Sequence, residues 1–298
     1  MLVELKARFD ERNNIVWARR LESVGAHVIY GVVNLKTHSK ICLIVRQESD
    51  GIRRYIHLGT GNYNPSTSKI YTDFGLLTSN LEIGEDATHV FNYLTGYSNK
   101  REFNHLLVAP LNLRSGLEQL IDREIEHARK GRSSGMIFKV NSLADPKMIN
   151  KLYEASRAGV LQELIVRGIC CLIPGWKGVS DKIHVRSIIG RFLEHSRIFY
   201  FENGGNPEIY CGSADLMERN LIRRVEILFP ILDQNLREKL KKTLELILSD
   251  NILAFNLRQD GSYERIEKKE QHLEVNSQME LMEWYADENV NGEIRSDV

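Results

Sequence analysis

Residues 192–205 read FLEHSRIFYFENGG, the stretch of this sequence that is most informative about its fold. The apolar, aromatic run after His195 is typical of a strand in a sheet core, and it stops at a turn-forming Asn-Gly-Gly. Side chains alternate along a strand, so the His-x-Arg pair places His195 and Arg197 on one face. The stretch therefore predicts a buried strand that carries an imidazole and a cation to one edge of a sheet.

The pattern to which His195 and Arg197 belong occurs twice in the chain. An Arg at the end of an apolar run is followed by His-x-cation and then by a Gly-rich turn. The first copy is Arg8, His38, Lys40 and the turn GTGNYN at 59–64; the second is Arg167, His195, Arg197 and the turn GSAD at 212–215. The Arg-to-His spacings are 30 and 28 residues, and the His-to-Gly spacings are 21 and 17. Cations and turn N–H groups bind phosphate, and histidine accepts a phosphoryl group, so the repeat predicts two half-sites facing one cleft.

Composition fits a globular protein with room for two domains, because 42% of the 298 residues are hydrophobic and 27% are charged. No apolar run approaches 18 residues. The four cysteines form no CxxC pair and are expected to be reduced core residues of a cytoplasmic protein. From Arg258 onward the charge is −6, which leaves +6 on the preceding 257 residues. That balance suits a polyanion-binding protein or an ordinary surface equally well.

Alternating strand and helix patterns predict an α/β fold, with two domains that are each a mixed sheet flanked by helices. Residues 113–159 add a helix, a strand and a helix that have no counterpart in the first half, so we expect the first domain to be truncated at its N-terminus. The domains are predicted at 1–105 and at 106–298, the second with an acidic tail. Predicted strands are 1–5, 26–31, 40–46, 54–58, 73–78, 136–140, 160–167, 183–187, 197–201 and 208–211, with 40–46 buried on both faces. Predicted helices are 11–25, 85–94, 113–131, 145–159, 235–249 and a stretch near 281–285.

The repeated HxK or HxR followed by a Gly-Ser turn resembles the phospholipase D superfamily. That family's pattern has an Asp five residues after the cation, where this chain has Val45 and Glu202. Two alternatives follow from this reading. One is a phosphodiesterase that uses one histidine as nucleophile and the other as general acid. The other is a non-catalytic fragment that binds polyanions.

A resemblance to the C-terminal catalytic region of bacterial polyphosphate kinase covers nearly the whole chain. It rests on VELKARFDE, LKTHSK, HLGTGNYN, IYTDFGLLT, VRGICCLIPG, FLEHSRIFYFENGG and GSADLMERN, which follow one another in the family's order. The resemblance implies two phospholipase D-like domains and an enzyme, a phosphotransferase. It also implies reversible transfer of the terminal phosphate of ATP to inorganic polyphosphate, with a phosphohistidine intermediate and Mg²⁺.

The resemblance also assigns roles to residues. His38 is implied as the phosphorylated nucleophile, and His195 as a general acid/base or phosphate-positioning group. The phosphate- and nucleotide-binding residues that it implies are Arg8, Lys40, Tyr71, Arg167, Arg197 and Arg224; its metal ligands are not identified. The implied partners are ATP or ADP, polyphosphate, and N-terminal and head domains that lie outside this sequence. A homo-oligomer without nucleic acid, in the cytoplasm or at the periphery of the inner membrane face, is also implied.

Overall fold

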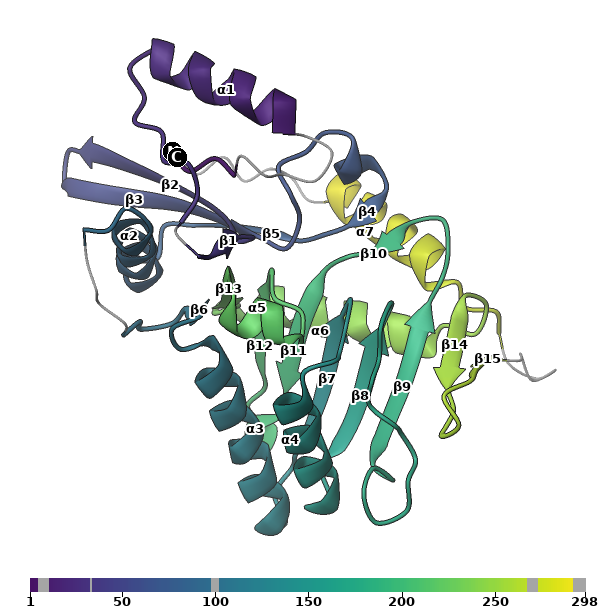
Figure 1. Ribbon diagram of the computed structural model, residues 1–298. Helices are drawn as coiled ribbons and strands as arrows, with labels where there is room; N and C mark the ends of the chain where they lie inside the picture. Colours follow the sequence, from purple (N-terminus) through teal and green to yellow (C-terminus); the bar gives the residue numbers. More distant parts are fainter. Residues whose placement is uncertain (5–10, 33, 98–101, 267–272, 292–298) are drawn as a thin grey trace.

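A ten-stranded mixed sheet forms the body of the protein (Figure 1). The structure is a computed structural model that describes residues 1–4, 11–32, 34–97, 102–266 and 273–291. The strand order is β1-β13-β12-β11-β7-β8-β9-β14-β15, with β6 also paired to β13. Strands β7, β8 and β9 are mutually parallel, and β11 runs antiparallel to β7. The strands of this sheet are β1 (Lys36–Thr37), β6 (Leu107–Ala109), β7 (Gly135–Val140), β8 (Leu161–Val166), β9 (Ile183–Ile188), β11 (Arg197–Phe201), β12 (Glu208–Gly212), β13 (Arg224–Pro230), β14 (Ala254–Leu257) and β15 (Tyr263–Arg265).

Helices cover both faces of this sheet. Leu117 and Ile121 of α3 and Leu152 of α4 pack with Phe138 and Phe199 on one face. On the other face, α6 packs against Ile198, Ile209 and Phe229 together with apolar residues of the first half of the chain. The helices are α1 (Glu11–Ser23), α2 (Leu81–Leu94), α3 (Leu113–Arg129), α4 (Pro146–Arg157), α5 (Glu218–Ile222), α6 (Gln234–Ser249) and α7 (Ser277–Asn291). None of the helices in the described ranges is both long and apolar enough to span a membrane.

The first half adds a smaller antiparallel sheet above the edge of the large one (Figure 1). It consists of β2 (Lys40–Glu48), β3 (Gly51–Gly59) and β5 (Gly75–Thr78), with α2 packed on β3. The prediction that 40–46 is buried on both faces is wrong, because Ile44 and Val45 are each more than half exposed. Strands β2 and β3 form a hairpin whose far end extends away from the large sheet (Figure 1). The apolar side chains at that end of β2 therefore have few neighbours to pack against.

Two short parallel strand pairings connect the two halves of the chain. β4 (Tyr71–Thr72) pairs in parallel with β10 (Leu193–Glu194), and β1 of the first half pairs in parallel with β13 of the second. The predicted strand at 26–31 is wrong: the backbone there makes only an isolated bridge between Leu2 and Ile29. A lone bridge gives too few ladder hydrogen bonds to define a strand. The predicted α/β class, with sheets flanked by helices, is confirmed.

Candidate phosphate-handling site

The β1–β13 pairing places His38. Its backbone N–H and that of Ser39 both donate to Val225 O, at 2.9 and 3.0 Å. His38 Nδ1 lies 2.9 Å from Glu226 Oε2, and Glu226 is fully buried. Ser213 Oγ donates to Oε2 at 2.5 Å, and Asn220 Nδ2 donates to Oε1 at 2.6 Å. A carboxylate only accepts, so His38 carries its proton on Nδ1 and presents the lone pair of Nε2.

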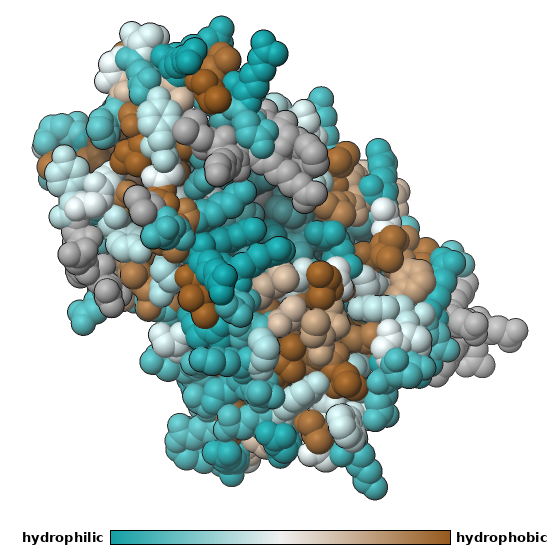
Figure 2. Space-filling view, in the orientation of Figure 1, coloured by the Kyte–Doolittle hydropathy of each residue, from teal (hydrophilic) through white to brown (hydrophobic). Residues whose placement is uncertain are grey.

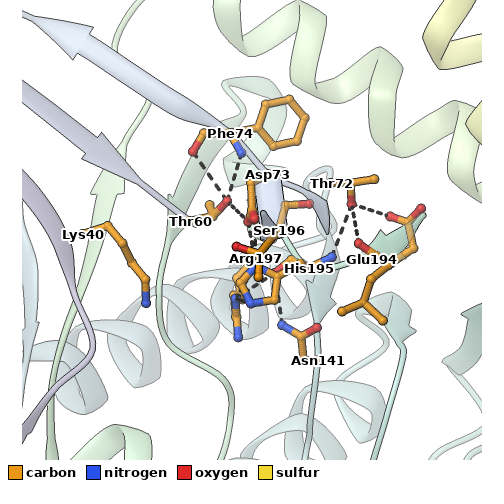
Figure 3. A network of polar contacts seen from close by, with 12 residues as sticks. Lys40, Thr60, Thr72, Asp73, Phe74, Asn141, Glu194, His195, Ser196 and Arg197 are labelled. Carbon is orange, nitrogen blue, oxygen red and sulfur yellow. Dashed lines mark hydrogen bonds and ion pairs between the residues drawn. The ribbon is translucent and has the colours of Figure 1, made fainter. Parts of the chain in front are cut away.

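The β4–β10 pairing places His195 in the same way. Its Nδ1 lies 2.8 and 2.9 Å from the two carboxylate oxygens of Asp73, and Thr60 Oγ1 donates to Asp73 at 2.6 Å (Figure 3). The ring of Tyr71 packs against this imidazole with 4.8 Å between the ring centroids. A Cβ added to Gly61 would lie 2.3 Å from Asp73 Oδ2, so glycine is required there for the carboxylate to reach His195.

The two histidine–carboxylate pairs are related by the sequence repeat, and each one crosses between the halves. Thr37 is in register with Val225, so His38 and Glu226 are the next residues on their strands. Glu194 is in register with Thr72, so His195 and Asp73 are likewise the next residues. The hydroxyls of Thr60 and Ser213 are also equivalent, since each accepts from the N–H that follows the carboxylate residue, Phe74 or Ile227.

Sequence reasoning missed Asp73 and Glu226, although Asp73 stands in the quoted block IYTDFGLLT and Glu226 lies two residues after the predicted Arg224. A signal was available. Each carboxylate follows the Gly-hydroxyl turn by a similar interval, 13 residues after Thr60 and 13 after Ser213. The same interval in both halves extends the repeat from the histidines to their partners.

The predicted cations gather around the imidazoles. Arg197 binds Asp215 with Nη2–Oδ2 at 3.1 Å, and its Nη1 lies 3.1 Å from His195 Nε2. Lys40 Nζ donates to the carbonyl oxygen of His38 and is 5% exposed on its strand beside the site (Figure 3). Arg224 begins β13, with Nη1 4.0 Å from Glu226 Oε1.

Arg167 is hydrogen-bonded to the backbone beside His195 and to Asn141. Asn141 and Arg167 follow the carboxyl ends of the neighbouring parallel strands β7 and β8, which meet at one edge. Arg167 Nε donates to Asn141 Oδ1 and to Glu194 O, both at 2.8 Å, and Asn141 Nδ2 donates to His195 O at 3.1 Å. Arg8 lies outside the described residues. The structure therefore brings together Lys40, Tyr71, Arg167, Arg197 and Arg224 with the two histidines.

Burial sets the protonation of this cluster. It lowers the pKa of His38 and of His195, outweighing the raising effect of Glu226 and Asp73, so both imidazoles are neutral at pH 7. The pKa of Lys40 is lowered to about 8, because burial, with a smaller contribution from Arg197, outweighs the attraction of Glu226. Burial raises the pKa of Asp215, but Arg197 and the backbone N–H of Asn141 more than compensate and leave it lowered. Hydrophilic side chains line the recess between the two sheets (Figure 2).

Among the described residues, the carboxylates of the site do not form a magnesium site of their own. Within the described ranges, no group of three or more His, Cys, Asp and Glu side chains is placed to bind a metal. Asp73, Asp215 and Glu226 each already accept from a histidine or an arginine. Magnesium prefers carboxylates together with phosphate and water oxygens.

The fold and the site define an α/β protein with paired histidine–carboxylate units in a cationic recess. Two family models match the chain: polyphosphate kinase C-terminal domain 1 over residues 1–100 and polyphosphate kinase C-terminal domain 2 over residues 106–278. The chain belongs to the polyphosphate kinase family, and the predicted resemblance is confirmed.

Known relatives agree with this assignment. The chain is 56% identical over 285 residues to the polyphosphate kinase of Parasynechococcus marenigrum, which covers 96% of this chain and 40% of that protein. It is 58% identical over 263 residues to that of Thermosynechococcus vestitus, covering 88% and 36%. The crystal structure of polyphosphate kinase from Porphyromonas gingivalis matches with a TM-score of 0.90 at 36% identity, over 98% of this chain and 44% of that one. The chain thus spans about 40% of the length of the curated relatives.

Proposed function

We propose that this chain carries the phosphoryl-transfer centre of a polyphosphate kinase, which reversibly transfers the terminal phosphate of ATP to inorganic polyphosphate through a phosphohistidine at His38. Family membership supports the activity. One geometric observation supports His38 rather than His195. Arg197 Nη1 contacts the His195 ring, 3.1 Å from Nε2 and 3.4 Å from Nδ1, whereas Nε2 of His38 has no hydrogen-bond partner among the described residues. The side chain of His38 is also 22% exposed, against 10% for His195.

The chemistry follows from that lone pair. His38 Nε2 attacks the terminal phosphorus of ATP, a bond forms between nitrogen and phosphorus, and the bond from phosphorus to the ADP oxygen breaks. A terminal oxygen of polyphosphate then attacks the same phosphorus, and the electron pair of the N–P bond returns to Nε2. Glu226 holds the Nδ1 proton in both steps and stabilises positive charge on the ring.

The neighbouring cations act on the moving charge. Phosphoryl transfer depends on positioning and charge neutralisation, and Lys40, Arg197 and Arg224 supply positive charge beside His38. We propose that His195 orients the transferred group or exchanges a proton with it, held in place by Asp73. Arg167, Tyr71 and Arg8 are proposed to bind phosphate or nucleotide.

The parts of the relatives that this chain does not cover belong to the same proposal. We infer that preceding N-terminal and head regions complete nucleotide binding, and that the two domains divide near residue 105. Magnesium would arrive with ATP, where its charge neutralises phosphate oxygens. A homo-oligomer of the full-length protein, in the cytoplasm or at the periphery of the inner membrane face, completes the proposal.

Labelling with ³²P-ATP tests the proposal. The chain is fused behind the preceding region of the Parasynechococcus marenigrum relative, and the protein label is tested for acid lability, which is characteristic of phosphohistidine. We expect His38→Ala to abolish the label, because a nucleophile cannot be bypassed. We expect His195→Ala to slow turnover about 10²–10⁴-fold while His38 remains labelled. Label on His195 in the His38→Ala protein would reverse the two roles. Polyphosphate binding without any covalent label would indicate a binding protein only.

A further inference from the structure

A glutamine of the C-terminal helix contacts the backbone that leads to His195. Gln278, in the first turn of α7, is 4% exposed. Its Oε1 accepts from Phe192 N at 2.9 Å, and its Nε2 donates to Phe192 O at 2.9 Å and to Glu194 Oε1 at 2.7 Å. A Cβ on Gly190 would lie 2.5 Å from Gln278 Oε1, so glycine lets the two approach. One side chain thus makes three hydrogen bonds to Phe192 and Glu194, just before His195.

Glu194 extends this contact to both members of the His195 pair. Its Oε2 lies 3.0 Å from Lys139 Nζ and accepts from Thr72 Oγ1 at 3.1 Å. Burial raises the pKa of Glu194, but Lys139 and the hydrogen bonds more than compensate and leave it lowered, so the carboxylate stays charged. Thr72 directly precedes Asp73, and its Oγ1 accepts from His195 N at 3.3 Å. The network therefore joins α7 to β10, which directly precedes His195, and to β4, which directly precedes Asp73.

The helix itself is anchored independently of Gln278. Asp250 Oδ2 accepts from Ser277 N at 2.7 Å, and Tyr285 OH lies 3.0 Å from Thr243 Oγ1 of α6. A cavity of about 320 Å³ adjoins the network, and Phe192, Glu194 and Gln278 are among its lining residues. The segment before His195 consequently has space to shift if its three hydrogen bonds to α7 are lost.

We propose that Gln278 is a positioning residue for catalysis: through Phe192 and Glu194 it holds His195 and Asp73 in register, so that α7 is part of the machinery that shapes the site. The catalytic part of this inference rests on the proposed function. The structural part, restraint of residues 190–196 by Gln278, does not.

Amide hydrogen exchange on this chain tests the structural part. Gln278→Met keeps the size and helix propensity of the side chain and removes all three bonds. Gln278→Glu keeps the shape but loses both donated bonds and faces Glu194 with a second carboxylate. We expect exchange in residues 190–196 to be at least about 10-fold faster in both variants, because these amides then open locally. The control Met279→Ala, at the next, 43% exposed position of α7, should leave it unchanged. Unchanged exchange at 190–196, or equal acceleration everywhere, would overturn the proposal.

Steady-state kinetics of the fused enzyme test the catalytic part. Loss of positioning should lower kcat about 10-fold and leave KM for ATP within about two-fold, since substrate contacts are intact. A merely structural role would reduce the amount of folded enzyme without changing kcat per folded molecule, and wild-type kcat in both variants would remove the catalytic role. If the wild-type fusion makes no polyphosphate while exchange at 190–196 still responds to Gln278, the proposed function fails and the restraint stands.

Discussion

Among single residues of the site, burial keeps the two imidazoles neutral, and a carboxylate partner orients each of them. Neutral His38 and His195 each donate a hydrogen bond from Nδ1–H to a carboxylate of the other half of the chain. The difference between them is that Arg197 Nη1 contacts the ring of His195, 3.1 Å from Nε2 and 3.4 Å from Nδ1, whereas Nε2 of His38 has no hydrogen-bond partner among the described residues. Two almost equivalent imidazoles thereby acquire different chemistry, because a nitrogen that accepts from an arginine is a poorer nucleophile than one with a free lone pair.

Replacing Glu226 by Gln should slow phosphorylation of His38 about 10²–10³-fold. Glu226 accepts from His38, Ser213 and Asn220, and an amide turns one of its two oxygens into a donor that opposes at least one of them. Single-turnover labelling of the fused enzyme measures the rate. Glu218→Gln, at an exposed partner of Arg223, is the control. A wild-type rate in the Glu226 variant would show that the carboxylate does not orient His38.

Lys40 should make anion binding sensitive to alkaline pH. Its pKa is lowered to about 8, so the ammonium is present below that pH and is lost as the pH rises through it. A bound phosphate favours the charged form and moves the midpoint upward. We expect tripolyphosphate affinity to fall about 10-fold between pH 7 and pH 10, measured by calorimetry. Lys40→Arg, which copies the residue of the second repeat, should remove this dependence. An equal decline in that variant would assign it to another group.

At the scale of elements, the sequence predicts best what depends on neighbours along the chain. The ranges of α3, α4 and α6 agree with the predicted 113–131, 145–159 and 235–249 to within two residues, and Asp145 caps α4 by accepting from Met148 N. Strand β11 matches the predicted 197–201. The exposed β2 and the missing strand at 26–31 were misjudged because an apolar run shows a preference for extended backbone and does not reveal which partner strand or helix it meets.

The residues of the candidate site also differ in whether the local sequence reveals them. The histidines and cations could be found because they recur in short, similar motifs. Asp73 and Glu226 were missed because only the β4–β10 and β1–β13 pairings bring them to the histidines. Asp73 is 122 positions from His195 in the sequence, and Glu226 is 188 positions from His38. Parallel pairing of two-residue strands leaves almost no local pattern, so only the fold reveals it.

Asp145→Ala should lower the free energy of unfolding by about 3 kcal/mol, the sum of a lost helix cap and an ion pair broken at one end. Asp145 is 1% exposed, accepts from Met148 N at 2.9 Å and holds Arg114 through two bonds of 2.8 and 2.6 Å. Asp145→Asn keeps an acceptor for the cap and should cost less. Urea denaturation measures both variants. Equal losses for Ala and Asn would mean that the ion pair alone matters.

At the scale of the whole molecule, the two halves share one core as well as one site. The cluster beneath α6 contains Ile56 and Leu58 of β3 and Val90 of α2, together with Ile209 and Phe229 of the large sheet. Strand β1 is hydrogen-bonded into that sheet, and each histidine depends on a carboxylate from the other half. Unfolding of the first half would therefore also expose apolar surface of the second and separate both pairs.

Leu58→Ala tests this coupling. Leu58 is fully buried, and its truncation should lower the free energy of unfolding by about 2–5 kcal/mol through lost burial and a cavity. Because the core is shared, amide exchange should accelerate in β12 and β13 as well as in β2 and β3. Ile44→Ala, on the neighbouring strand but 53% exposed, should cost less than about 1 kcal/mol and leave β12 and β13 unchanged. Acceleration confined to β2 and β3 in the Leu58 variant would mean that the halves unfold separately, and the site would then be an interface between independent domains.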